Sequence, residues 1–231
     1  MEQSVREPAE GSAMHELAHD PSSRKRFLKM VGGAGAAGAF SIFLAACGSD
    51  DESDTTGAST SEDSGAAAST KGDLAIVNYA LTLEYLEAAF YQDVLKSGQV
   101  TDPKIGAAAK MILANEQEHV AALKATAEKL GGPAAKKPKT DFTSVIDAGP
   151  DKILATAATV ENLGASAYLG QADKIKSKEV LAAALSIHTV EGRHAALLNF
   201  VTGKSITPDG PFAKPSSMDE VLKQVKPFLA S

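Results

Sequence analysis

Two halves of the sequence carry the same set of residues, and the set suits metal binding. Each half has a glutamate, a tyrosine seven residues later, and a Glu-x-x-His motif about 30 residues after the first glutamate. The first half supplies Glu84, Tyr91, Glu116 and His119. The second half supplies Glu161, Tyr168, Glu191 and His194.

Helical geometry would bring these side chains onto one face. On an α-helix, Glu116 and His119 lie about 60° and one turn apart, so they can reach the same point. Glu84 and Tyr91 lie within about 20° of the same face, as do the corresponding residues of the second half. Apolar residues flank all six Glu and His positions, which indicates that the shared faces point into a core.

Four buried carboxylates need compensating positive charge. Mutual repulsion and desolvation would cost several kcal/mol for each ionised group. Two divalent cations cancel the four charges, and carboxylates with one imidazole per ion favour iron or manganese. Cys47 is the only cysteine, so a cysteine-based zinc or redox site is excluded.

A single Glu-x-x-His motif is most often a solvated pair, and only its repetition favours a di-metal site. The alternative is a bundle that keeps these residue types without bound metal, with the tyrosines as core residues. We expect His188 to be a structural histidine rather than a ligand or a neighbour of the ligands. We also expect Glu118 to face water and Glu87 to lie at the rim.

The periodicity predicts an all-α fold without strands. Helices are expected over about 73–96, 103–130, 150–173 and 177–201, with Asp102-Pro103 as a start signal. A long crossover separates the second helix from the third, so the four form an antiparallel bundle over 72–202. The tail, 203–231, contains Ser217 and Glu220 at the spacing of a capping box, which predicts a short helix.

The residues of the predicted site resemble those of the ferritin-like superfamily of di-metal carboxylate proteins. The run Leu83–Tyr91 is similar to the first helix of exported bacterial ferritin-like domain proteins. The resemblance implies two iron or two manganese ions, one held by Glu84 and His119 and the other by Glu161 and His194. It implies that Glu116 and Glu191 bridge them.

The resemblance also implies a role for the two tyrosines. In the family, a tyrosine of this kind contacts a carboxylate ligand on a neighbouring helix. Each tyrosine here is about 10.5 Å along the axis from the glutamate of its own helix. We therefore expect Tyr91 to contact Glu161, and Tyr168 to contact Glu84.

The first 46 residues have the layout of an export signal peptide. Ser23–Lys29 resembles the twin-arginine signal except for Lys25 in place of the second arginine, which leaves the folded and unfolded export routes open. Leu44–Cys47 resembles a bacterial lipobox, in which Cys47 would be acylated. A transmembrane anchor is disfavoured because the apolar run is short and rich in glycine.

Residues 47–71 are expected to be an acidic, disordered linker, because 48–70 contain six acids, no bases and no large apolar residue. The folded part carries balanced charge, which excludes the basic stripe of a nucleic-acid-binding protein. We expect a cell-envelope lipoprotein anchored through Cys47 on the outer side of the bacterial cytoplasmic membrane, or a periplasmic protein. The chain is compatible with a homodimer.

The expected function is oxidase- or peroxidase-type chemistry on dioxygen or peroxide, with an external electron donor because a cysteine-bound iron is excluded. The alternative is a metal-binding or metal-free interaction module at the cell surface. A lipid tether and an extra tail argue against mineral storage in a closed cage.

Overall fold

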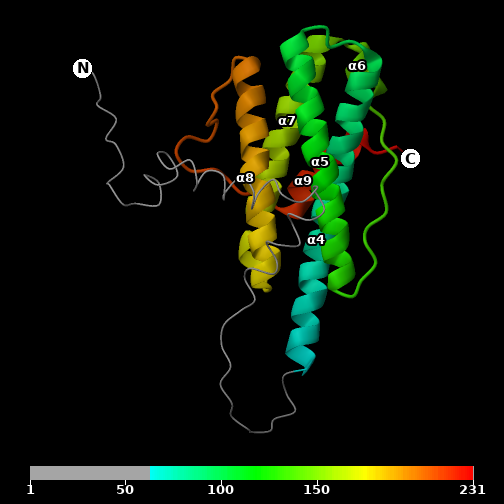
Figure 1. Ribbon diagram of the computed structural model, residues 1–231. Coiled ribbons are helices and arrows are strands. Elements are labelled where there is room, and N and C mark those ends of the chain that lie inside the picture. Colours follow the sequence, from blue (N-terminus) through cyan, green and yellow to red (C-terminus); the bar gives the residue numbers. More distant parts are fainter. Residues whose placement is uncertain (1–62, 231) are drawn as a thin grey trace, which may run out of the picture. The chain divides into compact units, whose positions relative to one another are not determined.

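The computed structural model describes residues 63–230, and this part of the chain is mainly helical (Figure 1). The long helices are α4 (Asp63–Ser97), α5 (Pro103–Lys129), α7 (Pro150–Leu169) and α8 (Lys178–Val201). Shorter elements are α6 (Thr143–Asp147), η1 (Ala172–Lys174), α9 (Met218–Val225) and η2 (Lys226–Phe228). The predicted signal peptide, Cys47 and most of the predicted linker lie outside the described residues.

The four long helices form the predicted antiparallel bundle. α4 packs mainly on α5, and α7 packs mainly on α8, each pair joined by a short connection. The 20 residues between α5 and α7 run along the side of the bundle in Figure 1 and carry α6. The all-α fold class, the long crossover and the short helix of the tail are confirmed.

Helix starts follow the capping signals in the sequence. The Asp102 side chain accepts hydrogen bonds from the backbone N–H groups of Lys104 and Ile105, at 2.8 and 3.0 Å, directly before α5. At α9, the Ser217 hydroxyl accepts from the Glu220 N–H at 3.3 Å, and the Glu220 carboxylate accepts from the Ser217 N–H at 2.8 Å. These side chains satisfy N–H groups that lack partners within the helix.

Two helix boundaries differ from the prediction. α4 begins at Asp63, ten residues early, and so includes the end of the stretch expected to be disordered. The alanines at 66–68 have the highest helix propensity and extend the helix that the core stabilises. α7 ends at Leu169, where the tail reaches it: the Ser216 N–H donates to the carbonyl of Ser166 at 3.0 Å, beside Gly170.

An aromatic cluster joins the bundle to the crossover and the tail. The rings of Phe90 and Phe142 pack edge to face with centroids 5.1 Å apart, and Phe142 lies 5.5 Å from Phe228. The backbone bridges the same two segments: the Asp141 N–H donates to the Phe228 carbonyl at 3.0 Å, and Thr140 pairs with Leu229 in the one β-bridge of residues 63–230. The tail therefore fixes the crossover against the bundle.

Within residues 63–230, no helix combines the length and the apolar character that crossing a membrane requires.

Candidate metal centre

The bundle interior contains all six predicted ligand residues. Glu84 comes from α4, Glu116 and His119 from α5, and the other three from α7 and α8. The four glutamates are completely buried, and the two histidines are 9% and 2% exposed. Because each helix buries this face against apolar neighbours, the fold places four carboxylates in a water-poor core.

The first half of the centre is organised around His119. Its Nδ1 atom lies 3.1 Å from Glu84 Oε2, 3.1 Å from Glu116 Oε2 and 3.2 Å from Glu191 Oε1. One nitrogen can donate only one hydrogen, so three oxygens around it cannot all be satisfied by that atom. The ligand atoms of these four residues all lie within 4.8 Å of one another.

The second half repeats this arrangement around His194. Its Nδ1 atom lies 3.0 Å from Glu116 Oε1 and 3.2 Å from Glu161 Oε2. Glu116, Glu161, Glu191 and His194 form the second group of ligand atoms within 4.8 Å. Glu116 and Glu191 belong to both groups.

Each tyrosine binds a glutamate of the opposite helix, Glu161 or Glu84, and each of these glutamates belongs to only one ligand group. The Tyr91 hydroxyl donates to Glu161 Oε1 at 2.6 Å, and the Tyr168 hydroxyl donates to Glu84 Oε1 at 2.5 Å. These are the two contacts that the sequence predicts. Both need α4 and α7 to run antiparallel, and each leaves the second oxygen of its glutamate facing the histidine.

Several ligand oxygens have no hydrogen-bond donor. Both oxygens of Glu191 and Oε1 of Glu116 are buried without one, although each residue lies close to a histidine. Buried polar atoms are normally satisfied, and unpaired carboxylate oxygens are costly. Metal cations among carboxylate and imidazole atoms would remove this cost, so the donor set fits a metal site.

The comparison with known families agrees with this geometry. Residues 72–204 match the sequence profile of the ferritin-like domain, and the match spans the four bundle helices. The chain belongs to this family. A search of curated proteins finds no match to the chain.

The ferritin-like domain contains neighbours of the ligands that sequence reasoning missed. The Nδ2 atom of Asn115 lies 3.0 Å from Nε2 of His194. This contact fixes the orientation of the imidazole ring. The corresponding position in the other half is Val190, so His119 has no equivalent neighbour there. Glu87, expected at the rim, is 3% exposed; that prediction was wrong.

Two other predictions near the centre agree with the structure. His188 is half-buried and its Nδ1 lies 3.0 Å from the carbonyl oxygen of Ala165, the contact of a structural histidine, and it belongs to neither ligand group. Glu118 is exposed, as expected from its position on the opposite face of α5.

The metal-free centre holds protons on its histidines. Burial lowers the pKa of His119, but close contacts with Glu116 and Glu191 outweigh it and raise the pKa to about 12. Burial likewise opposes protonation of His194, and contacts with Glu116 and Glu161 raise its pKa to about 9. Metal ions must displace these protons, because a histidine ligand is neutral.

The pKa values of the carboxylates in the metal-free centre shift in different directions. Burial and the charge of Glu116 raise the pKa of Glu84 to about 8. Burial and the charge of Glu84 raise the pKa of Glu191 well above its ordinary value. Burial also raises the pKa of Glu116, but the contacts of Glu116 with the two histidines outweigh burial and lower this pKa to about 2.

These shifts predict that the metal-free domain loses stability as the pH rises from about 5 to about 9. Groups with raised pKa values stabilise the fold fully below their unfolded values, near 4.3 for Glu and 6.5 for His. That contribution is lost as the pH passes the folded values, about 8 for Glu84 and about 9 for His194. Glu116 has a lowered pKa, so its contribution to stability is lost as the pH falls, but only in acid below this range.

Thermal unfolding of chelator-treated protein across this pH range measures the effect. The metal-loaded protein is the control, because binding that releases protons strengthens with pH. A melting temperature that rises with pH in the metal-free protein would contradict the assignment of protons to the centre.

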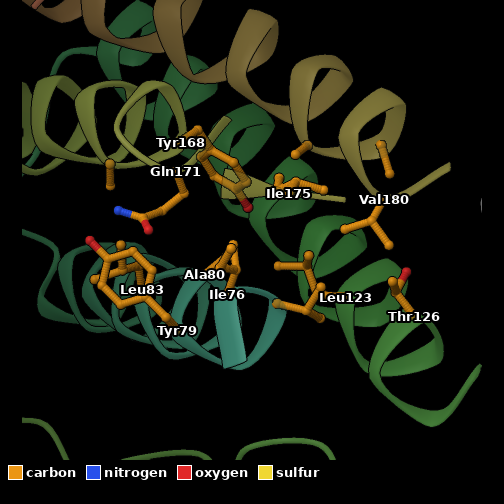
Figure 2. Close-up of a pocket in the computed structure, with 14 residues that line it drawn as sticks. Ile76, Tyr79, Ala80, Leu83, Leu123, Thr126, Tyr168, Gln171, Ile175 and Val180 are labelled. Atoms are coloured by element: carbon orange, nitrogen blue, oxygen red, sulfur yellow. The ribbon is translucent and has the colours of Figure 1, made fainter. Parts of the chain in front are cut away.

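Each end of the centre adjoins a cavity lined by apolar side chains. The cavity beside Tyr168 has a volume of about 20 Å³ and is shown in Figure 2. The Tyr79 hydroxyl and Gln171 Nε2, on the same side of it in Figure 2, are buried without a hydrogen-bond partner. A larger cavity of about 340 Å³ adjoins Tyr91 and is lined by the end of α4, the start of α5, the first half of α7 and the end of α8.

The tyrosines allow a matched set of variants. Tyr91→Phe and Tyr168→Phe should each lower metal affinity about 10- to 100-fold, because outer partners of metal ligands contribute that much. Tyr79→Phe is the control, since its hydroxyl has no partner to lose. Competition with a chromogenic chelator measures the affinities; equal affinities for all three variants would show that the two hydroxyls do not support the ligands.

Proposed function

We propose that the ferritin-like domain binds two iron or two manganese ions and uses them for redox chemistry on dioxygen or peroxide. The observation that carries the proposal is that two four-residue ligand groups share Glu116 and Glu191. Shared carboxylates place two ions next to each other rather than at independent sites, which is the arrangement that oxygen chemistry at a metal pair needs.

The geometry supports a role for each ligand. Glu84 and His119 would hold one ion, and Glu161 and His194 the other. Glu116 approaches both histidines through different oxygens, 3.1 Å from His119 and 3.0 Å from His194, which suits a bridging carboxylate. Glu191 belongs to both groups, and its Oε1 lies 3.2 Å from Nδ1 of His119. Neither of its oxygens accepts a hydrogen bond, so both remain available to the two ions.

A bound metal pair would supply electrons to an oxidant. The protein residues control what reaches it. The complete burial of the four glutamates keeps bulk water away from the centre. Tyr91 and Tyr168 orient the outer carboxylates, and burial and the neighbouring glutamates raise the pKa of both phenols, so they stay protonated and continue to donate.

The larger cavity suggests a route for the oxidant. Apart from Asp102 and Lys104 its lining is carbon-rich, and it adjoins Tyr91, which contacts the ligand Glu161. A small apolar molecule such as dioxygen can occupy such a space. The electron donor must be external, since the single cysteine cannot build a cysteine-bound iron site.

Turnover of peroxide and dioxygen by the metal-loaded protein tests the proposal. Consumption above that of free metal ions, lost in a Glu84→Ala, His119→Ala double variant, is the expected result. A domain that holds two metals but turns over neither oxidant would instead be a metal-binding module without redox function. A domain that cannot be loaded would be a metal-free interaction module at the cell surface.

We also propose that the protein is exported and anchored by a lipid on Cys47. The motif Leu44–Cys47 after a short apolar run supports this. Cys47→Ser should move the protein from the membrane fraction to the soluble fraction and abolish incorporation of labelled palmitate. Unchanged membrane association without label in either protein would contradict a lipid anchor and leave a peptide anchor in its place.

A further inference from the structure

The smaller cavity, beside Tyr168, contains two hydrogen-bond donors without acceptors. The Tyr79 hydroxyl of α4 and Nε2 of Gln171, just after α7, belong to its lining, and neither has a hydrogen-bond partner within residues 63–230. The two side chains are 8% and 2% exposed and lie on the same side of the cavity in Figure 2. Because buried polar groups are normally satisfied, two unpaired donors in one cavity point to a ligand that accepts hydrogen bonds.

Both groups are held as donors. Lys174 Nζ donates to Gln171 Oε1 at 3.4 Å, and an amide turned the other way would bring Nε2 against this second donor. Burial raises the pKa of Tyr79 well above its ordinary value, so the hydroxyl keeps its proton. The molecule that the two groups bind must therefore supply an oxygen acceptor.

The size and the walls of the cavity restrict what it can bind. Its volume of about 20 Å³ exceeds the roughly 10–15 Å³ that one water needs, and two polar partners suffice to order such a molecule. The other hydroxyls of the lining are already paired: Thr126 donates to the Ala122 carbonyl at 2.8 Å, and Tyr168 donates to Glu84. The described lining contains no charged side chain, and an unbalanced buried ion is costly. The cavity therefore suits one small, uncharged oxygen compound.

The two cavities occupy equivalent places in the internal repeat. Positions of α4 and α7 correspond at a separation of 77, as Glu84 and Glu161 do, and positions of α5 and α8 at 75, as Glu116 and Glu191 do. These separations relate most of the lining of the smaller cavity to that of the larger one. Examples are Ile76 with Ile153, Ala80 with Ala157, and Leu123 with Leu198. The fold therefore contains the same pocket twice, once at each end of the metal centre.

The two donors distinguish one copy of the pocket from the other. Gln171 corresponds to Val94, which is an apolar wall of the larger cavity. Tyr79 corresponds to Thr156, which is absent from the described lining of that cavity. The copy with the donors has a volume of about 20 Å³, and the apolar copy about 340 Å³. The two copies are therefore suited to molecules of different polarity.

We propose that the smaller cavity binds hydrogen peroxide, or water in its absence, through the Tyr79 hydroxyl and the Gln171 amide. Tyr168 separates this molecule from the metal centre, since Tyr168 lines the cavity and its hydroxyl donates to the ligand Glu84. Peroxide then approaches the centre from this end, and dioxygen from the apolar end. Binding of the acceptor stands on the geometry alone, whereas the use of peroxide rests on the function proposed above.

Crystal structures of the chelator-treated, full-length protein test binding without any turnover. We expect an oxygen atom within about 3.2 Å of both the Tyr79 hydroxyl and Gln171 Nε2, and density for two bonded oxygens after soaking in hydrogen peroxide. A Tyr79→Phe, Gln171→Leu double variant should show neither. A wild-type cavity without density before and after soaking would overturn the proposal, and so would a water that peroxide does not replace.

Stopped-flow absorbance of protein loaded with iron(II) tests the use of peroxide. In this reaction two iron(II) ions lose one electron each, and one hydrogen peroxide with two protons becomes two water molecules. Tyr79→Phe and Gln171→Leu should each slow oxidation by dilute peroxide roughly 2- to 10-fold, the effect of one hydrogen bond. Oxidation by dioxygen should keep its rate. The matched control is Tyr85→Phe, on the same helix but outside the cavity lining, which should change neither rate.

The comparison of the two oxidants separates a binding role from a structural one. If the variants at Tyr79 and Gln171 slow both oxidants equally, or slow neither, the assignment of the cavity to peroxide is refuted. If neither oxidant oxidises the loaded wild type, the proposed redox function fails instead. The crystal structures then still decide whether the two donors bind a small oxygen acceptor.

Discussion

Glu116→Ala and Glu191→Ala should each reduce the bound metal from two ions per chain to none. Each glutamate belongs to both ligand groups, so each ion loses a ligand and the charge that balances the pair. Elemental analysis after gel filtration measures the result. Retention of both ions by either variant would contradict the bridging assignment, and retention of one ion would show that the two sites are independent.

The control for these variants lies on the same helix. Glu118→Ala removes an exposed carboxylate two residues from Glu116 and should leave two ions bound. The metal-free Glu191→Ala protein should remain folded, because neither oxygen of Glu191 accepts a hydrogen bond and the variant loses only the 3.2 Å ion pair with His119. Loss of metal can then be separated from loss of structure.

Phe90→Ala should destabilise the domain by about 3–5 kcal/mol, the largest stability effect we expect of a single truncation. Phe90 is completely buried and packs edge to face on Tyr91 and Phe142, with ring centroids 5.3 and 5.1 Å apart. For a domain of this size the melting temperature should fall by roughly 6–20 °C.

The matched control is Phe212→Ala, since Phe212 is 82% exposed. Surface truncations of this kind change stability by about 0.5 kcal/mol or less. Because Phe90 also supports the ring of Tyr91, the Phe90 variant should bind metal more weakly than its loss of stability alone explains. Equal melting temperatures for the two variants would contradict the assignment of Phe90 to the core.

The centre could be predicted from sequence because its spacing is set by helix geometry. Glu84 and Tyr91 share a face whatever packs against it, and the repeat at Glu161 and Tyr168 then requires antiparallel helices with crossed contacts. The capping signals at Asp102 and Ser217 could be predicted for the same reason: they depend on residues two or three positions away.

Glu87 was not predictable because its environment depends on another helix. Its angular position on α4 fits either the rim or the core. The choice is made by the missing side chain at Gly164, more than 70 residues away in sequence. The same limit applies to Phe142 and Phe228, whose contact depends on how the tail folds back on the crossover.

The early start of α4 illustrates another limit. The acidic, small-residue composition before residue 71 indicated disorder, yet the helix continues back to Asp63. Composition alone ignores that a helix already nucleated by packing propagates at little cost into alanine-rich sequence.

Metal analysis of the protein purified without chelator is the most direct test of the proposed metal centre. We expect about two iron or manganese ions per chain, with Glu84, Glu116, His119, Glu161, Glu191 and His194 all required. A folded protein that contains no metal, and cannot be loaded with either metal at pH 8, would contradict it. The buried glutamates would then be protonated or paired with the two histidines alone.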